Sequence, residues 1–138
     1  MTTALKGLIV DFGGVLTDLG GVASGRPPLV GVVLAARSTG IRTALLSNAN
    51  PPSESVPWLE SLFDVVVFSG AVGVAKPDRR SYLITVRRLG LRPAECVFVD
   101  DLAANVRGAV AAGLVGVHHV SVSSTLDELA TLLGLEYS

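Results

Sequence analysis

Five short apolar runs, separated by stretches with helical spacing, constrain the fold of this chain most strongly. Each run is apolar throughout and lacks the alternation of apolar and polar residues found in a half-exposed strand. A continuous apolar run is typical of strands in a parallel sheet that is covered on both faces. Strands that alternate with helices predict parallel β-α-β units with right-handed crossovers, and therefore a three-layer α/β fold. The predicted strands are residues 6–12, 41–46, 64–68, 96–99 and 115–120, and the predicted helices are residues 29–39, 51–62, 76–90, 102–112 and 124–133.

The first run ends on a carboxylate, Asp11, and then breaks into the glycine pair Gly13-Gly14. In open α/β sheets, ligands bind at the carboxyl ends of the strands. A glycine pair lets the backbone turn sharply and come close to a ligand. We therefore predict that Asp11 is a nucleophile and that residues 13–28, rich in glycine and proline, form a loop.

Polar residues also follow the other strands. Ser47 and Asn48 follow the second strand, Asp100-Asp101 follows the fourth, and Lys76 stands after the third strand, across a loop predicted at residues 70–75. Because all carboxyl ends of a parallel sheet lie on one edge, these side chains should converge. Phosphoryl transfer requires such a set: an oxygen nucleophile, a divalent cation, and donors that hold the phosphoryl oxygens.

This constellation assigns a role to each residue. Attack by Asp11 on phosphorus would form an aspartyl-phosphate. Mg²⁺ prefers a few carboxylates with waters and substrate oxygens, so Asp11, Asp100 and the Gly13 carbonyl are the predicted direct ligands. Asp101 belongs to the same metal site, and with Asn105 it would orient waters or ligands. The predicted phosphate-binding residues are Ser47, Asn48 and Lys76.

Each of these residues also has a purely structural interpretation. Aspartate and serine at strand ends are common as helix caps and turn formers, and most lysines are solvated. The functional interpretation depends on their occurrence, in this order, at successive strand ends.

Four stretches carry a resemblance to a known family: Asp11-Phe12-Gly13-Gly14-Val15, Leu45-Leu46-Ser47-Asn48, Gly73-Val74-Ala75-Lys76-Pro77-Asp78, and Val97-Phe98-Val99-Asp100-Asp101 with Asn105 behind it. In this order they resemble the four motifs of the haloacid dehalogenase (HAD) superfamily, whose catalysts are mostly phosphatases. The resemblance implies a Rossmann-like, five-stranded parallel sheet of order 5-4-1-2-3 with helices on both faces. It also implies Mg²⁺-dependent attack by the first-motif aspartate.

The chain departs from that family pattern at two places. Phosphatases of the family usually carry a second aspartate two residues after the nucleophile, as general acid and base, and here that position is Gly13. General acid–base help contributes roughly 10²- to 10⁴-fold to a rate. Relatives also usually insert a helical cap between the first two motifs, where this chain has only the loop of residues 13–28. We therefore expect one HAD-like core domain over residues 1–138 with an open site, unless a partner, a second subunit or a large substrate covers it.

Composition excludes several other classes. A net charge of -1 gives no field that would attract nucleic acid or an anionic membrane, and 49% hydrophobic residues indicate a globular chain. No apolar run is long enough to span a bilayer, and the first residues lack a signal-peptide pattern. The lone Cys96 is expected to be a buried small hydrophobe, which suggests a reducing, cytoplasmic setting.

Other candidate residues are given structural interpretations. Trp58 and Tyr82 are expected at the core margin, and Arg26 is expected in solvent rather than on substrate. His118 and His119 close the fifth strand away from the metal, and Ser124 and Thr125 resemble the capping box of the last helix.

Two functions therefore compete. The first is a Mg²⁺-dependent phosphatase-like hydrolase acting on a phosphomonoester, small or macromolecular. The second is a catalytically weak HAD-like module that binds a partner protein or a phosphorylated ligand. A two-component receiver domain is disfavoured, because receivers place the acidic pair after the first strand, whereas Asp100-Asp101 follows the fourth. A true dehalogenase is also disfavoured, because it needs no metal.

Overall fold

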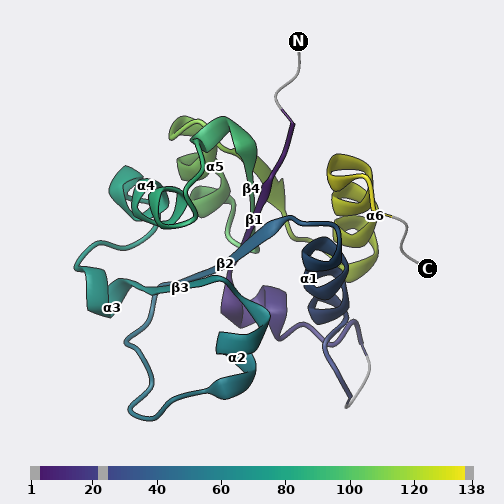
Figure 1. Ribbon diagram of the computed structural model, residues 1–138, viewed down its shortest axis with the longest axis horizontal. Helices are drawn as coiled ribbons and strands as arrows, with labels where there is room; N and C mark the ends of the chain where they lie inside the picture. Colours follow the sequence, from purple (N-terminus) through teal and green to yellow (C-terminus); the bar gives the residue numbers. More distant parts are fainter. Residues whose placement is uncertain (1–3, 22–24, 136–138) are drawn as a thin grey trace.

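The protein is built on a five-stranded parallel sheet, seen in a computed structural model that describes residues 4–21 and 25–135 (Figure 1). The strands are β1 (Gly7–Val10), β2 (Arg42–Ser47), β3 (Val65–Phe68), β4 (Cys96–Asp100) and β5 (Val115–His118). Their order is β3-β2-β1-β4-β5, with all pairs parallel. This is the predicted order 5-4-1-2-3 read from the other side, so the predicted fold class is confirmed.

Helices cover both faces of the sheet. On one face lie α1 (Pro28–Ser38), α2 (Pro57–Leu62) and α6 (Val122–Leu133), and on the other lie α4 (Arg79–Arg88) and α5 (Ala103–Ala111). The central strand contributes to both cores: Leu8 and Val10 pack in the cluster under α1 and α6, while Ile9 packs in the cluster under α4 and α5. Residues on both faces of β1 are therefore buried, which is why the strand is apolar throughout.

Several local predictions differ from the structure. The helix predicted at residues 51–62 spans only Pro57–Leu62. The segment after β3, predicted as a loop, begins with a short helix, α3 (Ser69–Val72). The helix predicted at residues 76–90 starts later, at Arg79, because Asp78 caps it and the Asp78 carboxylate accepts from the backbone N–H of Arg80 at 2.9 Å. The last helix is capped by Ser121 rather than by Ser124 or Thr125, and therefore starts earlier.

The link between β1 and α1 is also not entirely irregular. A short helical turn, η1 (Phe12–Leu16), starts at the last residue of the predicted first strand and runs into the predicted loop, and Gly13 and Gly14 have non-helical dihedral angles inside it. This turn buries Val15 and Leu16 against the core. Among the described residues of this link, 11–21 and 25–27, η1 is the only helix.

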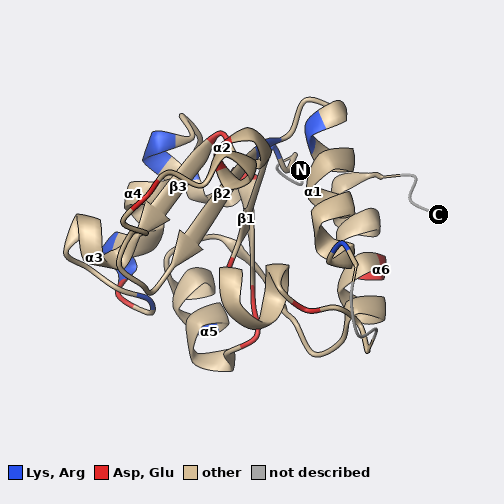
Figure 2. Cartoon of the chain, turned by 90° about the horizontal axis from the view of Figure 1, so that it is seen from below, with Lys and Arg blue, Asp and Glu red and all other residues tan. Residues whose placement is uncertain are grey.

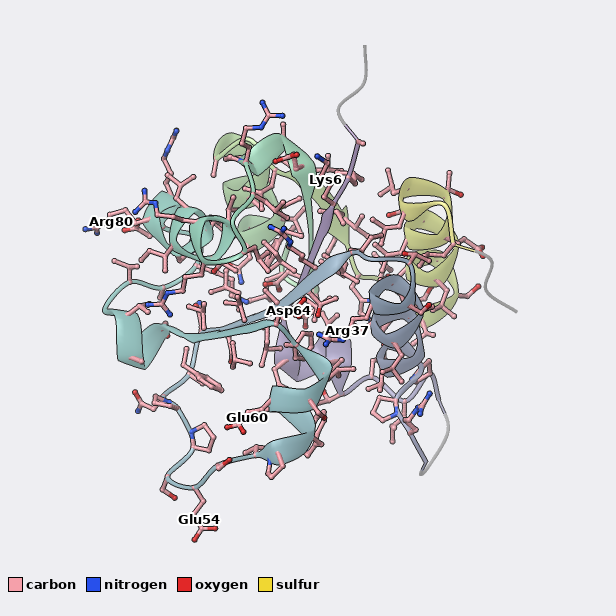
Figure 3. The ribbon with its side chains drawn as sticks, viewed as in Figure 1. Lys6, Arg37, Glu54, Glu60, Asp64 and Arg80 are labelled. Atoms are coloured by element: carbon pink, nitrogen blue, oxygen red, sulfur yellow. The ribbon has the colours of Figure 1, made fainter. Side chains whose placement is uncertain are left out.

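The charged pairs at the amino edge of the sheet are structural. Arg37 bonds to Asp64 at 3.1 Å, at the start of β3, and Lys6 pairs with Glu95 at 3.2 Å, just before β4 (Figure 3). The Arg37 guanidinium also donates to the Leu62 carbonyl at 3.1 Å. These contacts tie strand starts to neighbouring helix ends, while the candidate site lies at the opposite, carboxyl edge. Within residues 4–21 and 25–135, no helix combines the length and apolar character needed to cross a bilayer.

Candidate active site

The ammonium group of Lys76 lies between two carboxylates at the carboxyl edge of the sheet. Its Nζ atom donates to Asp11 Oδ1 at 2.8 Å and to Asp100 Oδ2 at 2.9 Å. Asp11 directly follows β1 and Asp100 ends β4, the neighbouring strand. The predicted convergence of side chains distant in the sequence is thus present in the structure. The lysine compensates two acidic groups that would otherwise repel each other.

Asp100 is fully buried and its carboxylate is fixed from several sides. Oδ1 accepts from the backbone N–H of Leu102 at 2.9 Å, and Oδ2 accepts from Asn105 Nδ2 at 3.1 Å. Asn105 reaches back from the first turns of α5, so the helix that follows β4 holds the carboxylate at its start. Asn105 thus contacts Asp100 directly, and its predicted role in orienting waters or ligands stays a prediction.

Three carboxylates gather at this edge. Asp11, Asp100 and Asp101 each offer an oxygen within 4.8 Å of the others, and acidic segments lie close together where β1 ends and before α5 starts (Figure 2). Burial raises the pKa of Asp11 above its usual value, the charge of Lys76 opposes this, and the charge of Asp100 adds to it. A set of carboxylate oxygens at this spacing suits a hard divalent cation such as Mg²⁺.

Asn48 has a contact that the sequence does not predict. Its side-chain amide donates to the Lys76 carbonyl and accepts from the Lys76 backbone N–H, both at 2.9 Å. The amide therefore holds the backbone of the lysine, and the Leu46 carbonyl accepts from Nζ at 2.9 Å. In this structure the Asn48 side chain is engaged with Lys76, so phosphate binding through that side chain remains a prediction.

Ser47 ends β2 and keeps 8% of its surface exposed. Its hydroxyl makes no hydrogen bond to another described residue, so it is available to a ligand. This is the availability that the predicted phosphate contact requires.

The two glycines after Asp11 meet different surroundings. Gly14 has φ +79°, and a Cβ on it would lie only 2.8 Å from the carboxylate carbon of Asp101. Gly13 has φ -68° and ψ 130°, which any residue adopts, and a Cβ there would meet nothing within 4 Å. Gly14 is thus required for the acidic cluster to close, whereas the space beside Gly13 is open. The predicted ligand role of the Gly13 carbonyl stays a prediction.

Two aromatic residues support the site from behind. Tyr82 is fully buried, so its predicted place at the core margin is wrong. Its hydroxyl donates to the Asn105 carbonyl at 2.6 Å, and its ring meets Phe98 edge-on at 5.3 Å. The Phe98 ring centroid lies 5.4 Å from Lys76 Nζ. The spacing of Tyr82 and Val86 on α4, continued by Leu89 directly after it, is the signal that could have indicated a buried stripe. Trp58, which is about half exposed, packs against Phe12 at a centroid distance of 6.3 Å.

The histidines lie outside the acidic cluster, in agreement with their structural interpretation. His118 Nε2 contacts the Asp101 carbonyl at 2.9 Å. The buried His119 ring bridges Asp18 Oδ2 and Thr125 Oγ1, both at 2.7 Å, and thereby links the segment after η1 to α6. Cys96 is buried, as predicted, and desolvation raises the pKa of its thiol to about 12.

Comparison with known proteins decides the family. The model of the haloacid dehalogenase-like hydrolases matches residues 22–113, which is more than half of the chain. The chain belongs to the haloacid dehalogenase-like hydrolase family. A crystal structure of an uncharacterized protein from Corynebacterium glutamicum superposes on this HAD-like chain with TM-score 0.88 and 35% identity, over 98% of this chain and 99% of that one. A HAD phosphatase from Thermococcus onnurineus superposes with TM-score 0.65 and 27% identity, over 81% and 59%.

Curated relatives of this HAD-like chain are longer proteins. The mouse protein acyl-CoA dehydrogenase family member 10 is 36% identical over 78% of this chain and 10% of its own length. The phosphatase MT3486 of Mycobacterium tuberculosis is 33% identical over 72% of this chain and 48% of its own length. The chain therefore spans about half, or less, of the curated relatives it matches.

Proposed function

We propose that the protein is a Mg²⁺-dependent, phosphatase-like hydrolase that acts on a phosphomonoester through an aspartyl-phosphate at Asp11. The observation that carries this proposal is the position of Lys76 Nζ, 2.8 Å from Asp11 and 2.9 Å from Asp100. To act as a nucleophile, the Asp11 carboxyl group must be ionised. The contact with Lys76 favours the ionised form, although burial raises the pKa of Asp11. Relatives named as phosphatases, such as MT3486, support the same reaction class.

The acidic cluster fits a magnesium ion. Asp11, Asp100 and Asp101 would hold it, because their oxygens lie within 4.8 Å of one another and carboxylates are its preferred protein ligands. When bound, Mg²⁺ would neutralise negative charge on the carboxylates and on the phosphoryl oxygens.

The chain's own residues have distinct roles in the proposed reaction. A carboxylate oxygen of Asp11 attacks phosphorus, and the bond from phosphorus to the leaving oxygen breaks. Lys76 orients that carboxylate and offsets the charge of the incoming phosphate. The Ser47 hydroxyl donates to a phosphoryl oxygen. Water then attacks phosphorus, breaks the acyl phosphate bond and regenerates Asp11.

The substrate and setting are part of the same proposal. The described part of the link between β1 and α1 carries no cap, so the site would accept a phosphorylated small molecule or macromolecule, with a partner or a second copy of the chain covering it. The free, buried Cys96 supports a reducing, cytoplasmic setting. Low net charge gives no support for nucleic acid or membrane as partners.

An assay of p-nitrophenyl phosphate hydrolysis with Mg²⁺, comparing the native protein with Asp11→Asn, tests the proposal. Asparagine keeps the shape of the side chain and an oxygen that can accept from Lys76, so the variant should fold while losing the nucleophile. We expect at least about a 10³-fold loss of kcat, on the scale of removing a nucleophile. Equal rates for the two proteins, or no turnover of any phosphate ester, would instead favour the second candidate, a module that binds a partner or a phosphorylated ligand.

A further inference from the structure

We propose that this site is selective for phosphates whose leaving oxygen departs as a weakly basic anion, as in acyl and aryl phosphates, over phosphates of aliphatic alcohols. The inference rests on the proposed function and names its substrate class. It follows from the absence, among residues 4–21 and 25–135, of a side chain placed to protonate a leaving group.

At the position where such an acid could stand, this chain has no side chain. Gly13, two residues after Asp11, has no side chain, and a Cβ built there would meet nothing within 4 Å. Its φ of -68° and ψ of 130° would suit any residue. Neither lack of space nor backbone strain accounts for the glycine, so the fold would tolerate an acid at a position where this chain has none.

Lys76 is the cation in direct contact with the nucleophile, but its N–H groups already donate hydrogen bonds within the protein. Each of its three N–H donors has an acceptor: Asp11 Oδ1 at 2.8 Å, Asp100 Oδ2 at 2.9 Å and the Leu46 carbonyl at 2.9 Å. To give a proton to a leaving group, the lysine would have to become neutral between two carboxylates. That change would remove the positive charge that is in direct hydrogen-bond contact with both carboxylates.

The other titratable groups near the strand ends also have hydrogen-bond partners already, among them His118, whose Nε2 contacts the Asp101 carbonyl at 2.9 Å. The Asp100 carboxylate accepts three hydrogen bonds, and Asp101 belongs to the cluster that would hold the cation as an ionised ligand. Asp18 accepts from the backbone N–H of Gly20 at 2.8 Å and contacts His119, which lowers its pKa and keeps it ionised. The Tyr82 hydroxyl donates to the Asn105 carbonyl.

The consequence for the reaction follows from the proton balance. When the carboxylate of Asp11 attacks phosphorus, the electron pair of the breaking P–O bond leaves with the oxygen. A carboxylate or a phenolate carries that charge without a proton, whereas an aliphatic alkoxide is strongly basic and requires one during bond cleavage. In the second step, water supplies the hydroxyl that ends on phosphate and its second proton passes to solvent or to phosphate itself, so both steps balance without a protein acid.

The test compares acetyl phosphate, p-nitrophenyl phosphate, phenyl phosphate and glycerol 3-phosphate as substrates of the native protein, Gly13→Asp and Gly13→Asn. For the native protein we expect kcat/KM to fall steeply along this series, by at least about 10²-fold from acetyl phosphate to glycerol 3-phosphate, the lower end of what a general acid contributes. Gly13→Asp should raise the ratio of kcat/KM on glycerol 3-phosphate to kcat/KM on acetyl phosphate by about 10²-fold or more. Gly13→Asn, of the same shape but without an acid, should not.

The outcomes separate this inference from the proposed function. Native activity that depends on Asp11 but is equal across the four substrates would overturn the selectivity while leaving the phosphatase proposal standing. Failure of every substrate, acetyl phosphate included, to show Asp11-dependent turnover would overturn the proposed function itself. If Gly13→Asp is inactive, the native series still decides, and an equal gain in Gly13→Asn would count against an acid-based explanation.

Discussion

At the scale of single residues, two adjacent glycines carry opposite constraints. Gly14 has φ +79° and faces the Asp101 carboxylate, whereas Gly13 has an ordinary backbone and open space beside it. We predict that Gly14→Ala destabilises the protein by about 1–3 kcal/mol, because alanine is strained at this φ and its methyl group would displace Asp101. Gly13→Ala should be neutral or stabilising by up to about 1 kcal/mol, because it restricts only the unfolded chain.

Urea unfolding of the two alanine variants measures this difference. Thermal-shift titration with Mg²⁺ gives a second readout, because displacement of Asp101 should also weaken metal binding in Gly14→Ala and leave it unchanged in Gly13→Ala. Equal stability of the two variants would mean that the contact between Gly14 and Asp101 does not restrict position 14.

At the scale of elements, a buried histidine joins the segment after η1 to the last helix. His119 contacts Asp18 and Thr125 at 2.7 Å each, although Asp18 lies 101 positions away in the sequence. The backbone N–H of Gly20, followed by His119, lowers the pKa of Asp18 below its usual 3.8. Because the native pKa is lower than the unfolded one, the unfolded state takes up protons first on acidification.

The pH dependence of this link follows from that order. The stabilising contribution of Asp18 is complete above the unfolded pKa near 3.8 and is lost as pH falls through the lower native value. We predict that Asp18→Asn costs at most about 1 kcal/mol of unfolding free energy between pH 5 and 7, since the carboxylate keeps access to solvent. The cost should shrink below about pH 4. Chemical unfolding of both proteins at several pH values measures it, and a cost that grows with acidification would contradict the assignment.

At the scale of the whole molecule, the parallel sheet and the site edge could be predicted because they depend on local patterns, whereas the strand order was implied by the resemblance to the HAD superfamily. Asp11, Ser47 and Asp100 each stand where an apolar run stops, and parallel strands bring those stops together. The helix α3 could not be predicted, since residues 69–72 are few and include a glycine and a β-branched valine.

Contacts between residues distant in the sequence could not be predicted for a different reason. The amide of Asn48 can bind phosphate or backbone equally well, and only the tertiary structure places it on the backbone of Lys76. The bridge from His119 to Asp18 likewise depends on the packing of α6 beside α1. The sequence thus predicts which groups meet at the sheet edge more readily than which partners hold them.

The site draws groups from β1, β2, β4 and the segment before α4, which lie between the two hydrophobic cores. A ligand that binds only when these groups are assembled must therefore stabilise the whole fold. We predict that Mg²⁺ with the phosphate mimic beryllofluoride raises the unfolding free energy by about 2.7 kcal/mol at 100 times its dissociation constant. Asp11→Asn should abolish this gain, because the mimic bonds to the carboxylate oxygen. Equal stabilisation of both proteins in thermal unfolding would locate the ligand away from Asp11.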